Sequence, residues 1–82
     1  MSVAERYECL INKLVAQVWT EIAKYPTNTP TQTIAPNVAG LVHLVAHRAG
    51  PTQPGVSLSE WADICTETYC QVIERLVHGV TM

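Results

Sequence analysis

Apolar residues recur at steps of three and four along the first part of the chain, which places their side chains on one face of an α-helix. A capping box formed by Ser2 and Glu5 predicts where this helix begins. Pro26 predicts its end, because the residue before a proline is disfavoured in the α conformation. We therefore expect a helix over residues 3–25. Its apolar positions are Tyr7, Leu10, Ile11, Leu14, Val18, Ile22 and Tyr25.

A second, shorter apolar helix is expected over residues 35–49. It follows a segment rich in threonine and proline, residues 26–36, which we interpret as a loop because its prolines interrupt regular structure. Gly50 and Pro51 form the expected stop. The apolar residues of this helix point in nearly every direction around its axis, so the helix must be covered on all sides.

The third expected helix spans residues 58–78 and has the strongest local start signal. Ser57 and Glu60 repeat the capping-box spacing, and Val56 with Trp61 has the spacing of a hydrophobic staple. We expect one side of this helix to be apolar, through Leu58, Ala62, Cys65, Tyr69, Val72, Ile73, Leu76 and Val80. The fold class is therefore all-α: one small three-helix domain, residues 1–82, with two long helices and a shorter apolar middle helix.

Composition favours self-association. Of the 82 residues, 48% are hydrophobic and only 15% are charged, against roughly 25% charged in an average soluble domain. Two long helices cannot cover every side of the middle helix, and Trp19, Trp61 and Ile64 lie off the main apolar seams. We therefore expect a homodimer that completes the core. Its predicted interface consists of Val38, Leu41, Val42, Leu44 and Val45.

Charge and hydropathy exclude several classes of partner. The formal net charge is −2 and the five basic residues are scattered, so the clustered positive field needed for nucleic acid is lacking. No apolar run approaches the ~20 residues that span a bilayer, and the first residues lack the apolar stretch of a secretory signal. We expect a cytoplasmic protein that binds neither nucleic acid nor membrane, with reduced cysteines.

The sequence contains no catalytic motif, and we expect neither enzyme activity nor a cofactor. His43 and His47 have the four-residue spacing with which two imidazoles can share a zinc ion. Their helix offers no carboxylate or thiol as a further ligand, so no metal site is predicted from the pair. A bundle that binds a ligand or metal through His43 and His47, with Cys65 or His78, is the alternative hypothesis.

The remaining candidates point to a protein partner. Trp19 and Trp61 are suited to anchor an interface, where large aromatic side chains supply much of the binding energy. The third helix also carries an acidic stripe that could contact a basic surface; it includes Glu60, Asp63, Glu67 and Glu74. The predicted function is that of a small non-enzymatic protein acting through protein–protein interaction. Inhibitors and adaptors of the phage or mobile-element type are the expected class.

Overall fold

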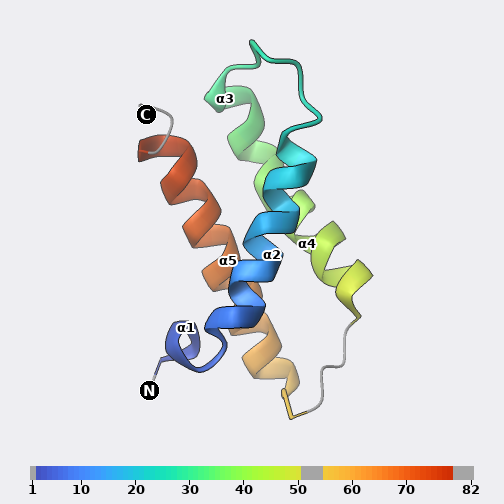
Figure 1. Ribbon diagram of the computed structural model, residues 1–82, viewed down its shortest axis with the longest axis vertical. Coiled ribbons are helices and arrows are strands. Elements are labelled where there is room, and N and C mark those ends of the chain that lie inside the picture. The colour runs from blue at the N-terminus through green and yellow to red at the C-terminus, as the bar shows by residue number, and fades with distance from the viewer. Residues whose placement is uncertain (1, 51–54, 79–82) are drawn as a thin grey trace.

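Every regular element is a helix in the computed structural model, which describes residues 2–50 and 55–78. The elements are α1 (Val3–Arg6), α2 (Glu8–Ile22), α3 (Thr31–Ile34), the 3₁₀ turn η1 (Ala35–Asn37), α4 (Val38–Ala49) and α5 (Leu58–His78). Figure 1 shows α2 beside α5, with α4 crossing close to both. The all-α prediction is confirmed for the described residues, whereas Pro51 and Val80 lie outside them.

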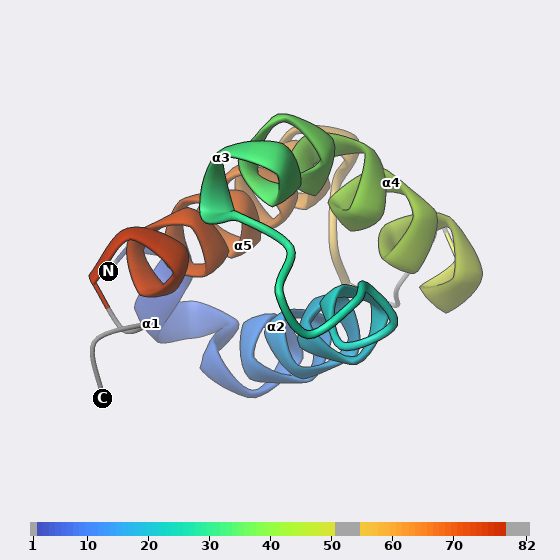
Figure 2. The ribbon, with the colours of Figure 1, turned by 90° about the horizontal axis from the view of Figure 1, so that it is seen from above.

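The core lies where α2, α4 and α5 meet. Viewed from above in Figure 2, α2 lies on one side of the pair formed by α4 and α5. Each helix contributes residues spaced by three or four, so each buries a single face. The central residues are Ile11, Leu14 and Val18 of α2, Val38, Val42 and Val45 of α4, and Ile64, Val72 and Leu76 of α5.

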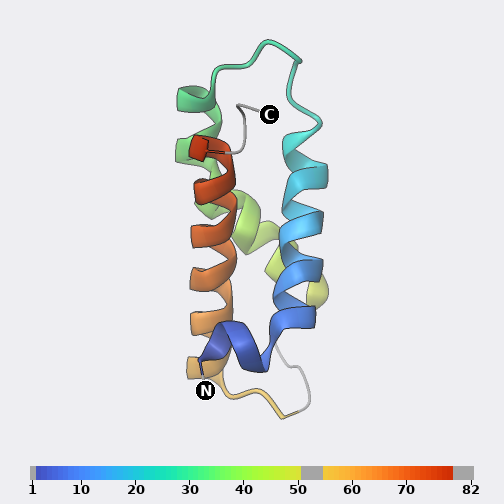
Figure 3. The same ribbon diagram turned by 60° about the vertical axis from the view of Figure 1, so that its left-hand side comes forward.

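The predicted helix over residues 3–25 is interrupted at Tyr7, which separates α1 from α2. Figure 3 shows α1 turned away from the axis of α2 and lying across α5. A contact with α5 stabilises this turn: the hydroxyl of Tyr7, the residue between α1 and α2, donates to Glu60 Oε2 at 2.9 Å. At the other end α2 stops at Ile22, and bonds of the tighter 3₁₀ type carry the chain to Tyr25.

The predicted loop over residues 26–36 is too long, because helical structure already begins at Thr31. Ile34 is buried in the core, and this burial stabilises the short helix α3. Pro36 has no N–H to donate to the preceding turn, so the chain passes through η1 before α4 begins. The predicted middle helix is therefore present as α4, preceded by two short helical turns.

Helix α5 has the bounds expected from the sequence, and Glu60 links its first turn to α1. The Ser57 hydroxyl accepts a hydrogen bond from the Glu60 N–H, and the Ser57 N–H donates to Glu60 Oε1, both at 3.2 Å. Arg6 Nη1 lies 3.0 Å from Glu60 Oε2. The bond from the Ser57 backbone, followed by the one from Tyr7, lowers the pKa of Glu60 below its ordinary value.

Acid should therefore release α1 from α5. Because the pKa of Glu60 is lowered in the folded chain, its contribution to stability is complete above the ordinary glutamate pKa and is lost as the pH falls through the lowered value. We expect the NMR methyl signals of Val3, which packs against the core, to move toward their unfolded positions at acidic pH. A Glu60→Gln variant should show this shift already at neutral pH, whereas the exposed Glu74→Gln control should not.

Candidate functional site

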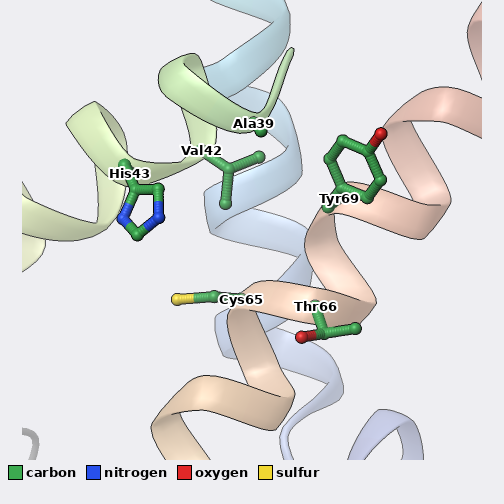
Figure 4. Close-up of a pocket in the computed structure, with 6 residues that line it drawn as sticks. All are labelled: Ala39, Val42, His43, Cys65, Thr66 and Tyr69. Carbon is green, nitrogen blue, oxygen red and sulfur yellow. The ribbon is translucent and has the colours of Figure 1, made fainter.

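A groove between α4 and α5 is the best candidate for a functional site in the described part of the chain. It consists of two adjoining hollows of about 200 and 500 Å³, which share His43, Cys65 and Thr66. Figure 4 shows the smaller hollow, with α2 behind the two helices that line it. We call the two hollows together the α4–α5 groove. Its lining residues are Ala39, Val42, His43, Ala46, His47, Leu58, Trp61, Ala62, Cys65, Thr66 and Tyr69.

Helical periodicity explains why these residues share a groove. On α4 they lie at steps of three and four from Ala39 to His47, beside the face that enters the core. On α5 they follow the same spacing from Leu58 to Tyr69. The predicted core-facing side of α5 includes this second stripe, and the structure separates the two. The groove therefore uses an apolar stripe that α5 carries in addition to its core face.

None of the residues that line the groove is an aspartate, glutamate, lysine or arginine. Its polar groups are two imidazoles, the Tyr69 and Thr66 hydroxyls and one thiol, and the Thr66 hydroxyl donates to the Ala62 carbonyl at 3.0 Å. Burial raises the pKa of the Cys65 thiol. A raised pKa keeps the thiol protonated, whereas a cysteine nucleophile or metal ligand acts as the thiolate. The groove is suited to binding apolar surface.

The structure brings together three of the four residues of the alternative metal-binding hypothesis. His43, His47 and Cys65 all line the groove, and Figure 4 shows the His43 ring and the Cys65 sulfur pointing into the same space. Over residues 2–50 and 55–78, however, no three histidine, cysteine, aspartate or glutamate side chains are placed to hold a metal ion. His78 lines a separate hollow with Glu74 and Arg75. The described residues of one chain therefore do not fit a closed metal site.

The residues expected at a dimer interface are mostly inside the chain. Val38, Val42 and Val45 are buried because α2 and α5 both pack against α4. Leu41 is half-buried and packs against the same core, whereas Leu44 stays 38% exposed. The expectation that three helices cannot cover α4 is therefore wrong for the three valines. The predicted interface is therefore not available as a whole to a second copy: Leu44 and part of Leu41 are its accessible members, and Val42 lines the groove.

The two tryptophans, expected as exposed anchors, are both half-buried and pack against the core. Trp61 also lines the groove, so part of its surface is available to a partner. The indole N–H of Trp19 is buried, and no hydrogen-bond acceptor in the described part of the chain reaches it. Of the two, Trp61 is therefore the better placed for binding.

The carboxylates of the acidic stripe on α5 differ in whether they make contacts within the chain. Glu60 is occupied by Arg6, Tyr7 and Ser57 and is therefore structural. Glu67 accepts a hydrogen bond from Gln71 at 3.1 Å on its own helix. Asp63 and Glu74 remain exposed. The stripe offers fewer free carboxylates than the sequence suggested.

Comparisons with protein-family models, with curated proteins and with solved structures found no match for this chain. The function therefore has to be inferred from its own geometry and chemistry. Among the helices described here, none is both long enough and apolar enough to cross a membrane.

Proposed function

We propose that this protein acts by binding a helix of another polypeptide chain in the α4–α5 groove. The observation that carries this proposal is that the groove is open to solvent, largely apolar and lined by no aspartate, glutamate, lysine or arginine. A groove between two helices can accept the apolar face of a third amphipathic helix. Because α2 already covers the other side of α4 and α5, an incoming helix would complete a four-helix arrangement.

The chemistry of the groove supports binding over catalysis. A protonated thiol and two imidazoles on an apolar wall provide none of the activated nucleophiles or charge-stabilising groups that acyl or phosphoryl transfer needs. Trp61 offers the kind of half-buried aromatic surface that anchors protein interfaces. An inhibitor or an adaptor, of the phage or mobile-element type, remains the class of function that we propose for such a domain.

A charge placed in the groove should weaken the binding of a helix. The probe is a designed amphipathic helical peptide with leucines on one face, added in excess to isotopically labelled protein and followed by NMR. We expect shifts concentrated at groove residues such as His43 and Thr66. Ala62→Arg, which puts an unpaired charge on the apolar wall, should weaken the peptide affinity by at least about tenfold.

Ala16→Arg is the matched control, because Ala16 is equally an exposed alanine on a helix but lies on α2, outside the groove. It should leave the affinity unchanged. Shifts spread over the whole surface, or equal effects of the two substitutions, would mean that the groove is not a binding site.

A further inference from the structure

The face that carries the α4–α5 groove also carries a large apolar side chain, which has the chemistry to enter a groove of this kind on another molecule. Leu58, the first residue of α5, lines the larger hollow and is nevertheless 79% exposed. Tyr69, at the other end of the groove, is another of the large hydrophobic residues that stay exposed. The same surface therefore presents both a hollow and a projection, which is the requirement for an interface that pairs with itself about a twofold axis.

Charge favours a second copy over a charged partner. None of the groove residues is an aspartate, glutamate, lysine or arginine, and the formal net charge of −2, which counts histidine as neutral, is carried by other residues. A charged helix seated here would have its charges desolvated without counter-charges, which is costly. A second copy brings a face that likewise has no carboxylate, ammonium or guanidinium group, so none of these charges is buried without a partner.

The shape of the walls allows two copies to approach closely. Ala39, Ala46 and Ala62 line the groove, and the separation of packed helices depends on the side chains at their contact. Ala39 and Ala62 are themselves exposed, so only methyl groups stand at these two positions of the walls, and the larger hollow measures about 500 Å³. Closure of the groove would also bury the accessible part of Trp61.

We infer that the occupant of the α4–α5 groove is a second copy of this chain, with Leu58 of each copy seated in the groove of the other. This inference rests on the proposed function, because it names the partner for the same surface. It also relocates the dimer expected from composition: the contact uses the outer stripes of α4 and α5, while Val38 and Val45 stay in the core and Val42 lines the smaller hollow. The low charged fraction of 15% fits a chain that buries surface by association.

The test is the mass of the full chain in solution, measured by light scattering and by sedimentation over a range of concentrations. Wild-type protein should have twice the chain mass of 9.0 kDa. Ala62→Arg should give the mass of one chain, and Ala16→Arg should remain a dimer. Leu58→Ala, which removes the projection and adds no charge, should raise the dimer dissociation constant by about tenfold or more. Circular dichroism confirms that each variant is folded.

The outcomes separate this inference from the proposed function. A dimer that Ala62→Arg splits and Ala16→Arg leaves intact supports both. A monomer that binds the amphipathic peptide in the groove overturns the second copy as occupant and leaves the proposed function standing. A monomer that does not bind the peptide there overturns both. A dimer that survives Ala62→Arg and Leu58→Ala associates through another surface, and the inference is then wrong.

Discussion

Replacing Ile64 by alanine should lower the free energy of unfolding by about 2–5 kcal/mol, the range for deleting a large aliphatic side chain from a packed core. Ile64 has 0% of its surface exposed and belongs to the core cluster shared by α2, α4 and α5. At roughly 0.05–0.15 kcal/mol per residue, a domain of this length has only about 4–12 kcal/mol of stability. The variant should therefore lose a large part of it. Urea denaturation followed by circular dichroism measures the change.

Val77→Ala is the control on the same helix, because Val77 is 58% exposed. Its free energy of unfolding should stay within about 0.5 kcal/mol of the wild-type value. Both variants are compared with wild type at one protein concentration, so that any association contributes equally. If the two substitutions cost the same, Ile64 does not lie in the core, and α5 is rotated about its axis relative to the structure.

Local signals predicted the start of the third helix well because they depend on neighbouring residues. The capping box of Ser57 and Glu60 forms as expected, with both reciprocal hydrogen bonds present. At the N-terminus Ser2 likewise accepts a hydrogen bond from the Glu5 N–H. These contacts span three residues, so they are encoded in the sequence next to the helix that they start.

The orientation of α5 could not be read from its own sequence. Leu58, Cys65 and Tyr69 fit a core-facing stripe, and Ile64 lies off it, but the structure buries Ile64 fully and leaves Leu58 largely exposed. Helix α5 carries two adjacent apolar stripes, one for the core and one for the groove. Which stripe faces inward depends on where α2 and α4 pack, and that is information from other segments.

The groove and the break at Tyr7 were missed for the same reason. The bond from Tyr7 to Glu60 joins residues 53 apart, and no local pattern announces it. The groove exists only once α4 and α5 are placed side by side. The width of the apolar surface on α5 was the one available signal, since it exceeds what a single neighbouring helix covers.

Replacing Val45 by aspartate should unfold the domain. Val45 on α4 is buried among residues of α2 and α5, so a carboxylate there would be desolvated without a counter-charge. An uncompensated buried charge costs roughly 3–5 kcal/mol, which is comparable to the lower end of the about 4–12 kcal/mol expected for a domain of this length. We expect the circular dichroism signal of helix to be lost, or the urea midpoint to fall sharply.

Leu44→Asp is the decisive companion, because Leu44 is the next residue along α4 and is 38% exposed. It should fold with nearly unchanged stability, since its carboxylate can stay in water. Leu44→Asp and Ala62→Arg together also distinguish two locations for a dimer interface. Leu44 does not line the α4–α5 groove, so Leu44→Asp should leave a groove-mediated dimer intact. If Leu44→Asp gives the mass of one chain while Ala62→Arg does not, the interface lies on the outer surface of α4 around Leu44, beside the buried valines.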